Sequence, residues 1–332
     1  MNDSYERDTL KLKSLKHREC LDLELTNRCN ALCTFCPRDK TPKQGFISDD
    51  HFHKALSFAV AENITVSLTG QGESLIHPKF IEYVQTIKKT GLKCWVTTNA
   101  ALLSETLADK LLDAGLDQIS FSVSNLWSDY ESVYNLPFDT TLKNIKYFLQ
   151  VNKNRCKVQI SIVKNKQNKN KHREMREFWM DLGVDRSNIE LLSQTTRAGA
   201  CDTDYLFVKT DKFRPEARRI AEEHNVVGCV IPFGAPAIGW NGNHYLCCHD
   251  YEKKDPLGSV DDIDIIGVSE KKMTRVLDSD NSICRKCNLD PISEIQELLL
   301  RTEQNIRTEE AMNSLIARLK NRLQRASGLD IS

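Results

Sequence analysis

Residues 29–36 read C-N-A-L-C-T-F-C, and this C-x3-C-x2-C run follows a short apolar segment at residues 21–25. Three thiolates this close together can hold a soft metal centre, either zinc or an iron–sulfur cluster. A structural zinc site and an ordinary cubane each need four ligands, and no fourth cysteine or histidine lies nearby. One coordination position is therefore expected to stay open, which is typical of a reactive metal site. Half of a zinc site, completed from a distant segment, is the alternative.

This motif resembles that of the radical S-adenosylmethionine (radical SAM) superfamily. The resemblance implies a [4Fe-4S] cluster on Cys29, Cys33 and Cys36. Its uncoordinated iron would bind the amino and carboxylate groups of SAM. The aromatic residue before the last cysteine, Phe35, would lie near the adenine.

The composition bounds the class of protein. A chain of 332 residues is long enough for one large domain with a small appendage. Lys plus Arg and Asp plus Glu each count 46, so no global basic field indicates a nucleic-acid partner. No apolar run approaches the ~18 residues of a membrane span, and the first residues lack the apolar core of a signal peptide. We therefore expect a cytoplasmic protein with no membrane partner.

The twelve cysteines fall into groups that do not suggest disulfides. In a long chain without an export signal, clustered cysteines are expected to be metal ligands or catalytic groups. Seven form two motif groups, namely Cys29, Cys33 and Cys36, then Cys229, Cys247, Cys284 and Cys287. The other five are by default small buried apolar residues, namely Cys20, Cys94, Cys156, Cys201 and Cys248.

The first two hundred residues alternate apolar strands with amphipathic helices. The expected strands are 21–25, 64–68, 92–96, 118–123, 158–163 and 189–192, and the expected helices are 49–61, 78–89, 104–114, 139–152 and 170–182. Such βα repeats predict an α/β fold with a parallel sheet and right-handed crossovers. The pattern alone does not separate an open sheet from a barrel. The radical SAM resemblance implies a partial (β/α)6 TIM-like barrel, with its chemistry at the carboxyl ends of the strands.

Two turns after these strands resemble SAM-binding elements of the family. Residues 69–78 read T-G-Q-G-E-S-L-I-H-P, in which glycines permit close backbone approach and Glu73 offers a carboxylate for an ammonium group. Gly72 and Glu73 match the Gly-Gly-Glu element that binds the SAM amino group, although a plain βα turn has a similar sequence. Asn99, in a turn similar to Thr-Asn-Gly, either shapes the SAM pocket or caps the turn.

Further candidates stand at the ends of later strands. Ser122 and Ser124 share one face of the fourth strand, because side chains alternate with a period of two, and the resemblance makes them candidates for the ribose and carboxylate of SAM. Val163 resembles the apolar residue that packs on adenine. Arg197 is expected at the mouth of the barrel, where its planar fork would clamp a substrate or SAM carboxylate; a surface arginine in a connecting loop is the alternative.

The second cysteine group has the spacing C-x12-G-x4-C, a long gap, and then C-x2-C. Asn241-Gly242 predicts a hairpin turn that brings Cys229 and Cys247 together. Four thiolates make a closed site, and from spacing alone zinc and iron–sulfur are comparable. The region resembles the SPASM/twitch extension of radical SAM enzymes. Because no cysteine follows Cys287, the resemblance implies one auxiliary [4Fe-4S] cluster, as in radical SAM dehydrogenases of aminocyclitol antibiotic biosynthesis.

Two features near the C-terminus are open to more than one interpretation. Cys248 either buries its sulfur as a small apolar group or donates a hydrogen atom to a substrate radical, and Asp250 is a candidate neighbour of the auxiliary cluster. Apolar residues spaced along 292–325 predict one long amphipathic helix or a helical pair. That segment would pack on the rest of the chain or form a dimer, so the oligomeric state stays open.

Together these observations divide the chain into an N-terminal extension (1–20), a radical SAM partial barrel (21–200), a connector (201–225), a SPASM/twitch domain (226–290) and a helical tail (291–332). The resemblance implies an oxidoreductase that cleaves SAM reductively and oxidises or epimerises a sugar- or aminocyclitol-like small molecule. Its electron donor would be a low-potential protein such as flavodoxin or ferredoxin. The alternatives are a peptide maturase and a non-catalytic zinc protein.

Overall fold

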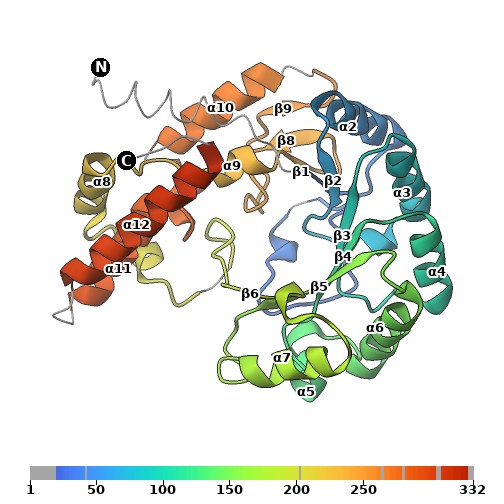
Figure 1. Cartoon of the computed structure of the whole chain (residues 1–332). Coiled ribbons are helices and arrows are strands. Elements are labelled where there is room, and N and C mark those ends of the chain that lie inside the picture. Colours follow the sequence, from blue (N-terminus) through green and yellow to red (C-terminus); the bar gives the residue numbers. More distant parts are fainter. Residues whose placement is uncertain are drawn as a thin grey trace. The chain divides into compact units, whose positions relative to one another are not determined.

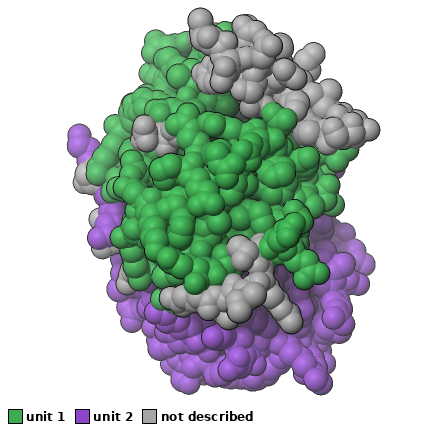
Figure 2. Space-filling view, turned by 90° about the vertical axis from the view of Figure 1, so that its left-hand side faces the viewer, with its two compact units in different colours: residues 1–19, 195–236, 244–332 green, residues 20–194, 237–243 purple. Residues whose placement is uncertain are grey.

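The computed structural model describes residues 20–41, 43–201, 203–262, 265–278, 281–303 and 308–327. The chain divides into two compact units, which are coloured separately in Figure 2. The barrel unit comprises residues 20–194 and 237–243, and the cysteine-rich unit comprises 195–236 and 244–332 together with 1–19. All but the last residue of the predicted N-terminal extension lies outside the described residues.

The barrel unit contains a parallel sheet with the order β6-β5-β4-β3-β2-β1-β7. Each strand pairs in parallel with its neighbours, for example with Leu21 of β1 opposite Val66 of β2. This topology confirms the predicted α/β fold class and is consistent with a partial TIM-like barrel. The strands are β1 (Cys20–Leu23), β2 (Thr65–Leu68), β3 (Cys94–Thr98), β4 (Gln118–Ser122), β5 (Lys157–Val163), β6 (Ile189–Leu192) and β7 (Ala237–Ile238).

Helices lie along the outside of this curved sheet (Figure 1). Five of them match the predicted ranges to within two residues, which is the usual uncertainty of helix ends. These five are α2 (Asp49–Glu62), α3 (Phe80–Lys89), α4 (Glu105–Asp113), α6 (Phe138–Asn152) and α7 (His172–Asp181). A sixth helix, α5 (Trp127–Tyr134), was not predicted. Short 3-10 turns cover Arg38–Lys40 (η1), Ser74–Ile76 (η2) and Arg186–Asn188 (η3).

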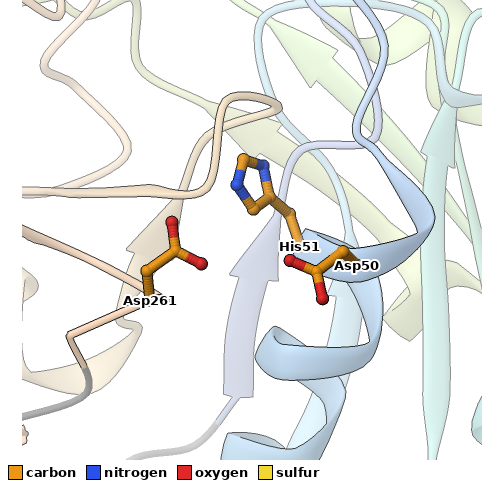
Figure 3. A group of neighbouring side chains, drawn as sticks. All are labelled: Asp50, His51 and Asp261. Atoms are coloured by element: carbon orange, nitrogen blue, oxygen red, sulfur yellow. The ribbon is translucent and has the colours of Figure 1, made fainter.

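The first turn of α2 shows how local sequence starts these helices. The Ser48 side chain accepts a hydrogen bond from His51 N, as an N-cap should. Asp50 and His51 follow in that turn (Figure 3). The Asp50 carboxylate pairs with Lys54 at 2.7 Å, one turn later. Acidic groups here also face the positive end of the helix dipole, which favours this start.

The core of the barrel unit lies between the sheet and these helices. Alternate strand residues are fully buried, and from the helices the Trp179 side chain of α7 is fully buried as well. Such alternation is what the apolar pattern of the sequence predicted. The strand residues include Leu21, Leu23, Val66, Leu68, Ile119, Phe121, Ile160 and Ile162.

The cysteine-rich unit is built mainly from helices. The predicted tail forms two helices that pack on α8 (Arg214–Glu223), through a cluster that includes Ala217, Ile295 and Leu315. None of the described helices is long and apolar enough to cross a membrane. The elements are η4 (Leu206–Lys209), α8 (Arg214–Glu223), α9 (Ile231–Gly234), β8 (Asn243–Tyr245, which begins at the last barrel-unit residue), β9 (Gly258–Ser259), α10 (Ile265–Leu277), η5 (Cys284–Lys286), α11 (Pro291–Thr302) and α12 (Thr308–Ser327).

Candidate active site and auxiliary cysteine site

The loop after β1 carries the first three cysteines, which are all half-buried. Cys36 N donates to Cys33 O at 3.1 Å, and the Arg38 guanidinium donates to Cys29 O at 3.0 Å. Burial raises the pKa of the Cys29 thiol to about 11 and raises that of Cys33 further. In the metal-free protein these thiols are protonated at neutral pH, so metal ligation must displace their protons.

Gly72 lies directly against the backbone that leads into this loop. A Cβ on Gly72 would stand 2.3 Å from Thr26 O and 2.5 Å from Arg28 O, so only glycine fits. The next residue joins the same backbone, since Glu73 N donates to Arg28 O at 2.8 Å. The Gly72-Glu73 turn is therefore joined to the start of the cysteine loop.

Glu73 and Asn99 connect the next two strand ends. The Glu73 carboxylate accepts from Asn99 N at 2.8 Å and from Leu75 N at 3.2 Å, and burial raises its pKa. The Asn99 side chain does two things: Oδ1 accepts from Ala101 N at 3.0 Å, and Nδ2 donates to Asn30 Oδ1 at 2.9 Å. The Asn99 side chain therefore caps its turn and also contacts the cysteine loop, and its part in shaping a SAM pocket stays a prediction.

Both candidate serines hydrogen-bond with the Tyr134 side chain. Ser124 has no exposed surface, and its hydroxyl accepts from Val163 N at 3.0 Å and from the Tyr134 hydroxyl at 2.9 Å. In this conformation Ser124 joins β4, β5 and α5, and its hydroxyl presents no surface to a ligand. Ser122 and Val163 are half-buried at the ends of β4 and β5, and Phe35 is half-buried in the cysteine loop. Their contact with SAM stays a prediction.

Several residues of this site were missed by reasoning from the sequence. The Glu24 carboxylate accepts from Gln71 N at 2.7 Å, and Asn168 Nδ2 donates to Ser124 O at 2.6 Å. Within the cysteine loop Asn30 accepts from Asn99 Nδ2, and Tyr134 O accepts from Leu32 N of the same loop. Of these residues, only Tyr134 could have been found from the sequence, because Tyr130 and Tyr134 are four residues apart, the spacing of neighbours on one helix face.

The four later cysteines come together in the cysteine-rich unit, all of them buried. They line one pocket, with apolar walls from Ile231, Pro232, Ile283 and Leu289. The predicted approach of Cys229 and Cys247 is confirmed by this shared pocket. The predicted turn is also present, since Gly242 has φ of 77° and its N donates to Gly239 O at 2.9 Å.

No three cysteine sulfurs in the described residues are close enough together to share one zinc ion as they stand. All twelve cysteines lie in the described part of the chain, and no three of their sulfurs come within 4.8 Å of one another. Thiolates that share one zinc ion at 2.3 Å stand about 3.8 Å apart. A cubane holds each thiolate on a different iron and so separates the sulfurs more widely. The thiolate donors of both sets, three in one loop and four lining one pocket, are of the kind that binds iron–sulfur clusters.

Arg197 lies in the cysteine-rich unit rather than with the barrel strands. Its guanidinium donates to His249 Nδ1 at 3.3 Å and lies over the Tyr251 ring at 5.0 Å. Arg197, Ala198 and Gly199 all have positive φ. A non-glycine residue in that region is strained, and such strain concentrates at functional sites. Arg197 is thus held beside the Cys247 loop.

The remaining cysteines only partly follow the default expectation. Cys94 and Cys156 are buried as predicted, whereas Cys20 and Cys201 are half-buried. The Cys248 thiol is exposed, so its interpretation as a small buried apolar group is wrong. A sulfur next to a ligand of the auxiliary site therefore has surface to offer a reaction partner.

Comparison with known families accounts for both sites. The model of the radical SAM superfamily matches residues 23–178, and that of the SPASM iron–sulfur cluster-binding domain matches residues 229–288. The chain combines a radical SAM domain with a SPASM domain. The radical SAM domain implies a [4Fe-4S] cluster with SAM, and the SPASM domain implies auxiliary iron–sulfur ligation, as the two cysteine sets indicated.

Curated relatives match only part of the chain. A tungsten-containing aldehyde ferredoxin oxidoreductase cofactor-modifying protein of Pyrococcus furiosus is 27% identical over 194 residues, which are 56% of this chain and 54% of the relative. A probable GTP 3′,8-cyclase of Sulfolobus acidocaldarius is 35% identical over 120 residues, 35% of this chain and 38% of the relative. The chain thus spans about half or less of these relatives.

Solved structures support the fold alone. Streptococcus suis SuiB bound to precursor peptide SuiA has a TM-score of 0.63 at 16% identity, covering 86% of this chain and 74% of SuiB. BtrN in complex with AdoMet and 2-DOIA has a TM-score of 0.52 at 14% identity, covering 82% of this chain and 93% of BtrN.

Proposed function

We propose that the chain is a radical SAM oxidoreductase that dehydrogenates or epimerises a sugar- or aminocyclitol-like small molecule. The observation that carries this proposal is the buried set of four cysteines in the SPASM region, with no further cysteine after Cys287. A cluster held by all four would have no free iron for a substrate. Its role would therefore be electron transfer, which suits an oxidation.

The barrel unit would hold the reacting group. Cys29, Cys33 and Cys36 would hold the [4Fe-4S] cluster, which with SAM would supply radical abstraction of a hydrogen atom from the substrate. Glu73 and Asn99 orient the SAM amino acid end, since both are joined to the cysteine loop. Ser122 would contact the ribose and carboxylate, and Phe35 and Val163 would contact the adenine. The buried polar network around them excludes water from the radical.

The cysteine-rich unit would decide the outcome after hydrogen abstraction. A cluster on Cys229, Cys247, Cys284 and Cys287 supplies an acceptor for one electron, and cluster potentials of roughly −700 to +450 mV allow this. If the substrate radical loses a proton and this electron, the product is oxidised by two electrons. If the exposed Cys248 thiol donates a hydrogen atom to the substrate radical instead, the product is an epimer, and the thiyl radical left on Cys248 would return to the thiol by taking one electron from the low-potential donor and one proton from solvent. Arg197 would clamp an anionic substrate group.

A second candidate function is peptide maturation. It is favoured by the fold similarity to SuiB, whose solved complex contains a precursor peptide. In either case the reducing electron would come from a low-potential protein such as flavodoxin or ferredoxin. BtrN, which was solved with 2-DOIA, and the probable GTP 3′,8-cyclase support the small-molecule choice.

In the experiment, reconstituted protein is incubated anaerobically with SAM, dithionite and one of two panels of candidate substrates. One panel contains sugars and aminocyclitols, and the other contains peptides. Mass spectrometry follows loss of two hydrogens, and deuterium uptake from solvent follows epimerisation. A small-molecule product two mass units lighter supports the proposal, as does deuterium uptake into a small molecule. Turnover of peptides alone would replace it by the second candidate. Stoichiometric zinc without iron would favour the third alternative, a non-catalytic zinc protein.

A further inference from the structure

The end of helix α5 contacts the cysteine loop through the loop's backbone. Leu32 N donates to Tyr134 O at 2.9 Å, and Thr34 N donates to Val133 O at 3.0 Å. A helix leaves its last carbonyls without partners inside the helix. Here two of them are satisfied by amides on either side of Cys33, the middle cysteine of the loop. The loop is thereby fixed to α5 at both neighbours of one ligand.

The Tyr134 hydroxyl joins this helix end to β4. It donates to Ser124 Oγ at 2.9 Å and accepts from Ser124 N at 2.9 Å. Ser124 Oγ in turn accepts from Val163 N at the end of β5. These groups are buried, where an unmade hydrogen bond is expensive. One hydroxyl therefore links the cysteine loop to two strand ends.

The ring of Tyr134 fixes a second group. Phe35 stands edge-on to it, with 5.7 Å between ring centroids and 84° between ring planes. The Tyr134 ring also stacks on the Tyr130 ring, with 4.5 Å between ring centroids. The Tyr130 hydroxyl in turn hydrogen-bonds with Thr141 of α6 at 3.1 Å. Such aromatic pairs add rigidity beyond the area that they bury. Phe35 is therefore held by a side chain that is itself held from two sides.

We infer that Tyr134 is a positioning residue, which holds the Cys33 segment and Phe35 in the geometry that the cluster and SAM require. This inference rests on the proposed function, and it adds a residue outside the motifs that indicated that function. The competing explanation is that Tyr134 is an ordinary core side chain. That explanation predicts a change in overall stability only, without a local effect on the cysteine loop.

The first test uses the metal-free full chain and Tyr134→Phe, which removes only the hydroxyl. Hydrogen exchange at residues 32 and 34 should become about tenfold faster, because the helix end loses its buried anchor. Exchange in β2 should not change, which controls for global unfolding. Tyr147→Phe is the matched control, since it removes an exposed hydroxyl that bonds with Asp109 at 3.0 Å. Equal exchange in Tyr134→Phe and wild type, or the same acceleration in β2, overturns the inference.

The second test uses reconstituted protein. Tyr134→Phe should bind SAM several-fold more weakly and change the EPR spectrum of the reduced, SAM-bound protein, while Tyr147→Phe matches wild type. Unchanged affinity and spectrum would overturn the inference even if stability falls. A wild type that binds no iron would refute the proposed function instead, and the exchange experiment would still decide whether Tyr134 holds the loop.

Discussion

Gly72→Ala should damage the cysteine loop more than its loss of stability alone would explain. The added methyl carbon would stand 2.3 Å from Thr26 O and 2.5 Å from Arg28 O. Carbon and oxygen normally stay about 3.3 Å apart, so the backbone must yield by about 1 Å. Overpacking of this kind costs about 1–3 kcal/mol. The displaced carbonyl of Arg28 also accepts from Glu73 N, so the shift reaches both the loop and the SAM-binding turn.

Tryptophan fluorescence during urea unfolding measures the loss of unfolding free energy in the barrel unit, where Gly72 lies. The four tryptophans, at positions 95, 127, 179 and 240, all belong to the barrel unit. Gly91→Ala is the matched control, because Gly91 has φ of 83° and open space around it. A left-handed alanine costs about 1–2 kcal/mol but disturbs nothing near the cysteines.

The two variants should therefore lose similar stability and differ in function. After reconstitution, Gly72→Ala should bind less iron and SAM, whereas Gly91→Ala should match wild type in both. Full iron and SAM binding by Gly72→Ala would refute the argument that this turn supports the loop. Equal loss in both variants would do the same, because it would reduce the effect to general instability.

Three further outcomes are expected. Ile295→Ala removes a fully buried side chain of the helical cluster and should lower the free energy of unfolding by about 2–5 kcal/mol, measured by circular dichroism; a cost no larger than that of the exposed Val208→Ala would contradict the packing described. Cys33→Ala should lower the iron content from about eight to about four per chain, whereas the buried Cys156→Ala should keep about eight, and equal values would dismiss the ligand assignment. Cys248→Ala should abolish deuterium-labelled epimer if the enzyme epimerises and leave a dehydrogenation unchanged; epimer formed at the wild-type rate would exclude this thiol as hydrogen donor.

The fold could be predicted well because its main signals are local. Alternating strands, the amphipathic helices and the motif cysteines are readable from neighbouring residues. α5 was missed because it is short, rich in aromatic residues and starts without a side-chain cap. Its stability comes from packing and from the loop amides it binds, and those partners lie about a hundred residues away in the sequence.

The same reasoning explains which surroundings of the candidate residues could not be predicted. Ser124 looked like a ligand contact because strand periodicity placed it beside Ser122, but its hydroxyl is consumed by Tyr134 and Val163. Arg197 follows the sixth strand in sequence, yet the adjacent Thr196 bonds to residues 286 and 288. Such long-range partners decide where a loop residue lies, and no local pattern records them.

The most direct test of the account is reductive cleavage of SAM by the purified chain. Anaerobically reconstituted wild type and Cys156→Ala, given SAM and dithionite, should both release 5′-deoxyadenosine and methionine, and Cys33→Ala should release neither. Iron-loaded wild type that yields no 5′-deoxyadenosine, or Cys33→Ala that yields as much as wild type, would contradict the claim that residues 29–36 form a radical SAM site.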